Sequence, residues 1–164
     1  MLQNNQDMLM LECGADAFAG LHSDFQKALR TAAEQYASAV PDASPWVVTS
    51  ALRSLKRQAE LMAEMTQEQL LAMYCSGGTP TYIQEICRAW PADAETIHRI
   101  LANRTEGYIS KHLYGLAADI DASSVADPDL FRKIMLENGA QAVLDERAMG
   151  IPCLHVSWKR HSVP

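Results

Sequence analysis

The sequence predicts an α+β fold in which a small, largely antiparallel sheet packs against helices. Segments with helical periodicity lie mostly in the first half of the chain, and short strand-like segments lie mostly in the second half. This grouping differs from the regular alternation of strand and helix that builds a parallel sheet. The length of 164 residues, of which 48% are hydrophobic, suits one domain with a substantial core.

The first predicted helix begins at Asp24, which can cap it, and runs to about Ala39. The residues expected on its buried face are Phe25, Ala28, Leu29, Ala32, Ala33, Tyr36 and Ala37. A proline-bounded segment, 41–45, ends this helix. The apolar run Trp46-Val47-Val48-Thr49 then predicts a short buried strand.

Each of the other predicted helices has its own start signal. These signals are Ser54, the capping box of Thr66 with Gln69, Pro80 at a first helical position, Asp93, and Asp127 followed by Pro128. The expected stops are Gly77-Gly78, Pro91 and Gly139. The predicted helices therefore make up most of the chain between the strand at 46–49 and residue 139.

Three further strands are predicted at 117–122, 142–146 and 153–158. In the first of these, Asp119 shares a face with Asp121, opposite Ala118 and Ile120. In the last, the apolar residues Leu154, Val156 and Trp158 alternate with Cys153, His155 and Ser157, so His155 is expected to face away from the core. We expect a single domain over 1–164, with a motif-bearing core at 46–158, an N-terminal helical segment at 1–45 and a helical insert at 66–104.

Composition excludes several classes of partner. A net charge of −6 without a concentrated basic stretch argues against nucleic acid. The four cysteines form neither a zinc knuckle nor a dense disulfide framework. No apolar run approaches a membrane span, and the N-terminal segment is a poor signal peptide. We therefore expect a monomer that does not insert into membranes and is cytoplasmic when synthesised.

Two histidines and an aspartate suggest a metal site. His112 and Asp119 are seven residues apart, and Gly115 can turn the chain between them so that both approach one point. His155 faces the same side if its strand buries its apolar residues. Imidazole and carboxylate are suitable ligands for Zn²⁺, and three protein ligands leave one position open, as in catalytic sites.

These residues also fill a longer pattern. Ser110, His112, Gly115, Ala117 and Asp119 form S-x-H-x-x-G-x-A-x-D, which resembles the zinc-binding signature of the D-Ala-D-Ala carboxypeptidase family. That family includes vancomycin-resistance-type peptidases, many phage endolysins and the related Hedgehog signalling domain. The segment 47–54, followed by Gln58, resembles the upstream arginine motif of these enzymes, and His155 resembles their last zinc ligand.

The resemblance implies a Hedgehog/DD-peptidase-like fold with one Zn²⁺ held by His112, Asp119 and His155. It also implies that Arg53 lies in the active site, near a substrate carboxylate and the developing oxyanion. As a fixed planar donor, an arginine suits both roles.

The general base departs from the family pattern. Family members usually carry a carboxylate two or three residues before the last histidine, where this chain has Cys153 and Pro152. The nearest upstream carboxylates are Asp145 and Glu146. If 142–146 and 153–158 pair as a hairpin, Glu146 could reach a metal-bound water, so we favour Glu146 and place Asp145 second.

The expected function is zinc-dependent hydrolysis of peptidoglycan stem peptides. Two alternatives are expected for the peptide bond that is cut. The protein acts as a D-Ala-D-Ala carboxypeptidase, or as a phage-lysin-like endopeptidase that cuts L-Ala–D-Glu or a cross-bridge. A lysis system would then release the protein to the cell wall. The alternative is a non-catalytic zinc-binding domain of the same fold that binds a partner, and the missing carboxylate beside His155 favours it.

Overall fold

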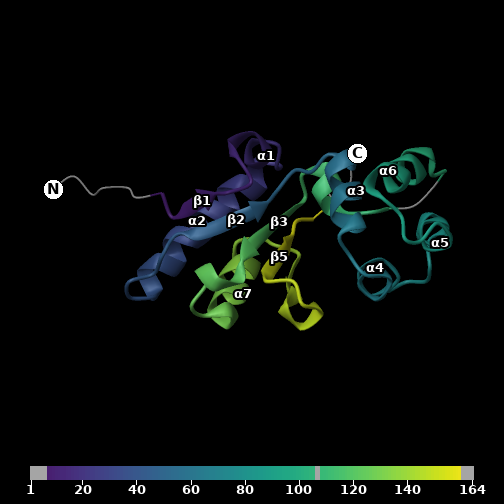
Figure 1. Ribbon diagram of the computed structural model, residues 1–164. Coiled ribbons are helices and arrows are strands. Elements are labelled where there is room, and N and C mark those ends of the chain that lie inside the picture. The colour runs from purple at the N-terminus through teal and green to yellow at the C-terminus, as the bar shows by residue number, and fades with distance from the viewer. Residues whose placement is uncertain (1–6, 106–107, 160–164) are drawn as a thin grey trace. The chain divides into compact units, whose positions relative to one another are not determined.

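A computed structural model describes residues 7–105 and 108–159, and this part of the chain contains seven α-helices and a five-stranded mixed sheet that is not closed (Figure 1). The predicted α+β class is confirmed. The chain divides into two compact units: a sheet unit, Met1–Leu52 with Tyr114–Pro164, and a helical unit, Arg53–Leu113. Each unit has its own hydrophobic core.

The sheet has the strand order β1-β2-β3-β5-β4. Its strands are β1 (Leu9–Leu11), β2 (Trp46–Ser50), β3 (Ala117–Asp121), β4 (Ala142–Asp145) and β5 (Cys153–Ser157). All neighbours pair antiparallel except β1, which runs parallel to β2. The prediction of a largely antiparallel sheet is therefore confirmed, and the three-residue strand β1 is an addition to it.

The helices of the sheet unit are α1 (Ala15–Ala19), α2 (Ser23–Ala39) and α7 (Pro128–Glu137), with short 3₁₀ helices η2 (Ala122–Ser124) and η3 (Glu146–Met149). The prediction that Asp24 caps α2 is wrong: the cap is His22, whose ring Nδ1 accepts a bond from the Asp24 backbone N–H at 3.3 Å. Asp127 caps α7 as predicted.

One face of the sheet is apolar and lies against α2 and α7. Ala118 and Ile120 of β3 are fully buried in the same core as Phe25 of α2 and Phe131 of α7. Leu154, Val156 and Trp158 belong to that core as well. This packing leaves the opposite face of β3 and β5 for polar side chains, as the alternation of residues predicted.

The helical unit contains α3 (Leu55–Ala63), α4 (Gln67–Tyr74), α5 (Thr81–Arg88) and α6 (Ala94–Asn103). Ser54, Thr66 with Gln69, and Asp93 cap their helices as predicted. Two boundaries differ: α4 ends at Tyr74, before Gly77-Gly78, and Pro80 is the cap of α5 and not its first helical residue.

The helical unit is wider than the expected insert at 66–104, because its core also takes in Ala59, Met62 and Ile109. The prediction of one domain over the whole chain stays a prediction. Within the described ranges, no helix has both the length and the apolar character needed to cross a membrane.

Gly115 makes the turn that leads into β3. Its φ of 68° lies in the left-handed region, which side chains other than glycine rarely adopt. A Cβ atom built there would collide with the backbone oxygen of Gly20. The turn is further fixed by the Gly115 carbonyl, which accepts a bond from the His22 N–H at 3.0 Å.

Replacing Gly115 by alanine should therefore cost about 2–5 kcal/mol of unfolding free energy, because the left-handed penalty adds to a backbone collision. Urea unfolding measures this loss. Gly150→Ala is the matched control: its φ is 77°, but a Cβ there meets nothing within 4 Å, so only about 1–2 kcal/mol should be lost. Equal losses in the two variants would refute the close approach.

Candidate metal centre

Asp119 and His155 lie side by side on the polar face of the sheet. They are direct partners in the antiparallel pairing of β3 with β5, and directly opposed residues point to the same side. The Nδ1 atom of His155 lies 2.8 Å from Oδ1 of Asp119, and both side chains are largely buried, with 20% and 13% of their surface exposed. The structure thus brings together two of the three predicted ligands.

The two side chains fit a shared metal ion. Both Nδ1 and Oδ1 are atoms that bind Zn²⁺, and two ligands of one tetrahedral zinc are about 3.4 Å apart when each bond is about 2.1 Å. Binding would therefore need loss of the proton between the two atoms and a separation larger by about half an ångström. Because both side chains are largely buried, they would attract a cation more strongly than an exposed pair would.

Glu146 lies next to this pair. The predicted hairpin is confirmed, because β4 pairs antiparallel with β5, with Leu144 opposite His155. The strand ends at Asp145, one residue earlier than expected, so Glu146 is the first residue of η3. Its carboxylate is buried, and Oε1 lies 3.8 Å from Nδ1 of His155. A carboxylate therefore stands beside the last predicted ligand despite its absence from the usual sequence position.

Asp145 points elsewhere. Its exposed carboxylate accepts two bonds from the guanidinium Nε of Arg147, at 2.9 and 3.2 Å. This hydrogen bonding, together with the backbone N–H of Arg147, lowers the pKa of Asp145 to about 2. A carboxylate held this way is a weak base and is already paired, so the geometry favours Glu146 over Asp145.

Cys153 contacts the same cluster: the alternation of residues placed it on the strand face of His155, but its bond to Glu146 was not predicted. Its thiol donates a hydrogen bond to Oε2 of Glu146 at 2.9 Å, and both residues are buried. One ligand atom each from Asp119, Glu146 and Cys153 lie within 4.8 Å of one another. Cys153 and His155 are two residues apart on one strand and therefore share a face.

The remaining predicted residues, His112 and Arg53, lie in the helical unit. His112 belongs to η1 (Lys111–Tyr114), and its carbonyl accepts a hydrogen bond from the Arg53 N–H at 3.0 Å. The Arg53 guanidinium donates to Gln58 Oε1 at 2.8 Å, and Gln58 in turn donates to the Tyr74 hydroxyl at 2.6 Å. The arginine motif, its glutamine and His112 are therefore neighbours. Their relation to Asp119 and His155 stays a prediction.

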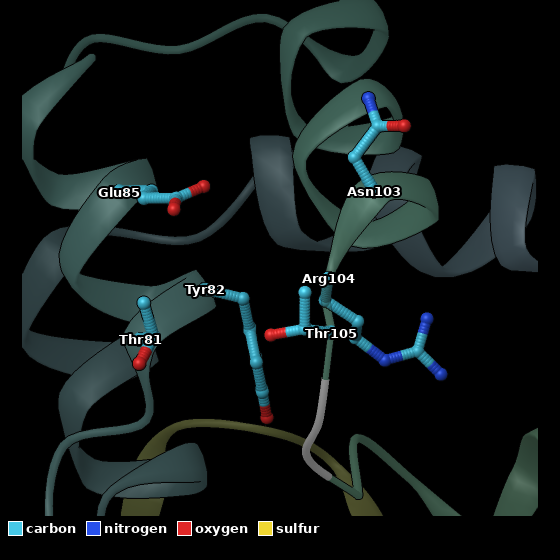
Figure 2. Close-up of a pocket in the computed structure, with 6 residues that line it drawn as sticks. All are labelled: Thr81, Tyr82, Glu85, Asn103, Arg104 and Thr105. Carbon is cyan, nitrogen blue, oxygen red and sulfur yellow. The ribbon is translucent and has the colours of Figure 1, made fainter.

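A separate small pocket lies within the helical unit between α5 and the end of α6 (Figure 2). It is lined by Thr81, Tyr82, Glu85, Asn103, Arg104 and Thr105. Burial raises the pKa of Tyr82 to about 12, so its hydroxyl stays protonated and donates to the Tyr108 carbonyl at 3.1 Å. None of the predicted site residues lines this pocket.

Candidate groupings of histidine, carboxylate and cysteine side chains that could hold a metal ion are therefore present. Comparison with protein-family models, curated proteins and solved structures finds no match for this chain.

Proposed function

We propose that this chain is a zinc-dependent peptidase of the D-Ala-D-Ala carboxypeptidase type, with a Hedgehog/DD-peptidase-like fold, that hydrolyses peptidoglycan stem peptides. The observation that carries the proposal is the buried carboxylate of Glu146, 3.8 Å from His155, which itself contacts Asp119 at 2.8 Å. A catalytic zinc site uses three protein ligands and a nearby base, and Asp119, His155 and Glu146 supply two candidate ligands and a candidate base within the sheet unit.

The third ligand in this proposal is His112. It precedes Asp119 by seven residues, and η1 is followed directly by the left-handed turn at Gly115 that leads into β3. In the proposed site, the imidazole of His112 joins Asp119 and His155 as a ligand of the same ion. Two imidazoles and one carboxylate suit Zn²⁺ and leave one position open for substrate or water.

The chemistry supplied by a zinc ion held there is polarisation of the scissile carbonyl and activation of a water molecule. Glu146 would accept the proton of the attacking water and return it to the leaving amine, acting first as base and then as acid. Arg53, whose guanidinium is oriented by Gln58, would donate hydrogen bonds to the developing oxyanion or to a substrate carboxylate.

The rival function, a non-catalytic zinc-binding domain, loses its main argument. It rested on the absence of a carboxylate two or three residues before His155. Glu146, at the start of η3 in the connection between β4 and β5, provides a carboxylate 3.8 Å from His155 instead. Digestion of substrate separates the two functions.

With one equivalent of zinc, the protein should release peptide or D-alanine from purified peptidoglycan, and a chelator should abolish the release. The mass of the released fragments identifies the bond. His112→Ala should lose both zinc and activity, because a ligand is missing, whereas His98→Ala, in α6 of the helical unit, serves as the matched control and should lose neither. If the folded, zinc-loaded protein releases no fragment, the binding domain is the better account.

Glu146→Gln should lower kcat/KM by about 10²–10⁴-fold, because the amide cannot accept the proton. Asp145→Asn, the matched control, should stay within a few-fold of the parent protein, because Asp145 pairs with Arg147. Kinetics on a soluble stem peptide, with zinc content measured in parallel, test both variants. Loss of turnover in Asp145→Asn with full activity in Glu146→Gln would reverse the assignment of the base.

A further inference from the structure

We propose that Asp119, Glu146 and Cys153 form a second metal-binding arrangement in the sheet unit, which takes a thiophilic divalent cation such as Cd²⁺ or excess Zn²⁺. The binding itself depends only on residues of this unit. Its effect on catalysis rests on the proposed peptidase function.

The geometry places three different ligand types around one point. Asp119 comes from β3, Glu146 from η3 and Cys153 from β5, so the three are held by three separate elements of one hairpin and its neighbour. Their ligand atoms lie within 4.8 Å of one another. Glu146 and Cys153 are each only 6% exposed, so their positions are fixed by packing.

The chemistry of the three groups favours a soft cation over Mg²⁺ or Ca²⁺. A cysteine ligand binds as thiolate, so the thiol would release its proton to solvent when the cation binds. The hydrogen bond from the Cys153 thiol to Oε2 of Glu146, 2.9 Å long, would then be replaced by two bonds to the cation. One thiolate and two carboxylates carry three negative charges against the two positive charges of the ion, and thiolate ligands select Zn²⁺-like ions.

A cation bound at this second site would inhibit catalysis, because it would occupy side chains that the proposed peptidase uses. While the Glu146 carboxylate binds a cation, it is a poor acceptor for the proton of the attacking water. Asp119 belongs to both groupings, so an ion beside Cys153 also competes for a ligand of the first site. We therefore expect excess thiophilic metal to inhibit the enzyme through Cys153.

The test is a titration of the full-length, zinc-loaded protein with Cd²⁺, followed by ultraviolet difference absorption. Thiolate-to-cadmium charge transfer gives a band that carboxylate and imidazole ligands do not give. The parent protein should show this band, and Cys153→Ser should lose it. All four cysteines lie in the described part of the chain and none is joined in a disulfide, so Cys87→Ser, a substitution in the helical unit, is the matched control and should retain the band.

Glu146→Gln should retain a band but require at least about tenfold more cadmium, because one carboxylate ligand is lost. A band of unchanged size in Cys153→Ser would overturn the proposal, as would cadmium binding to the parent protein without any band. Peptide release measured in the same samples separates the two proposals: a Cys153-dependent band in a protein that cleaves nothing would leave this site standing and refute the peptidase.

Discussion

The register of β3 against β5 is the constraint on which the candidate centre depends. It sets Asp119 opposite His155, and the same register sets Ala118 opposite Val156 and Ile120 opposite Leu154 in the core. A slip of one residue would turn every side chain of one strand to the other face. It would bury a carboxylate or an imidazole under α2 and α7, at a cost of several kcal/mol. The apolar face of the sheet therefore fixes the polar one.

The positions of Glu146 and Cys153 depend on the pairing of β5 with its other neighbour, β4. The β4–β5 hairpin brings η3 to the end of β5, and there the buried thiol meets the buried carboxylate. Gly115 plays the corresponding part before β3, because only a left-handed residue without a side chain fits against the Gly20 carbonyl. Strand pairing and turns thus bring the reactive side chains of the sheet unit together, and its α-helices pack against the apolar face of the sheet.

Local signals in the sequence predicted most elements of this fold. Alternation in β5 correctly predicted that Leu154 and Val156 face the core and that His155 does not, and Ser54, Asp93 and Asp127 each cap the helix that they were expected to cap. Strand β1 was missed because three residues carry no periodicity.

Residue periodicity left two features of the site undecided, and side-chain contacts within the hairpin decide them. Both faces of the 142–146 segment carry apolar residues, so periodicity could not choose between Asp145 and Glu146. Arg147 decides the matter by binding Asp145. The hydrogen bond between Cys153 and Glu146 joins residues seven apart, across the hairpin connection. It depends on the end of β4 at Asp145, one residue before the predicted end.

X-ray absorption at the zinc edge, on the protein carrying one equivalent of zinc, identifies directly the atoms that hold the ion. The His112–Asp119–His155 site should give nitrogen and oxygen neighbours alone, at about 2.0–2.2 Å, with loss of imidazole scattering in His155→Ala. A sulfur neighbour at about 2.3 Å at this stoichiometry would contradict it, because Cys153 would then hold the first ion and the His–Asp–His site would not.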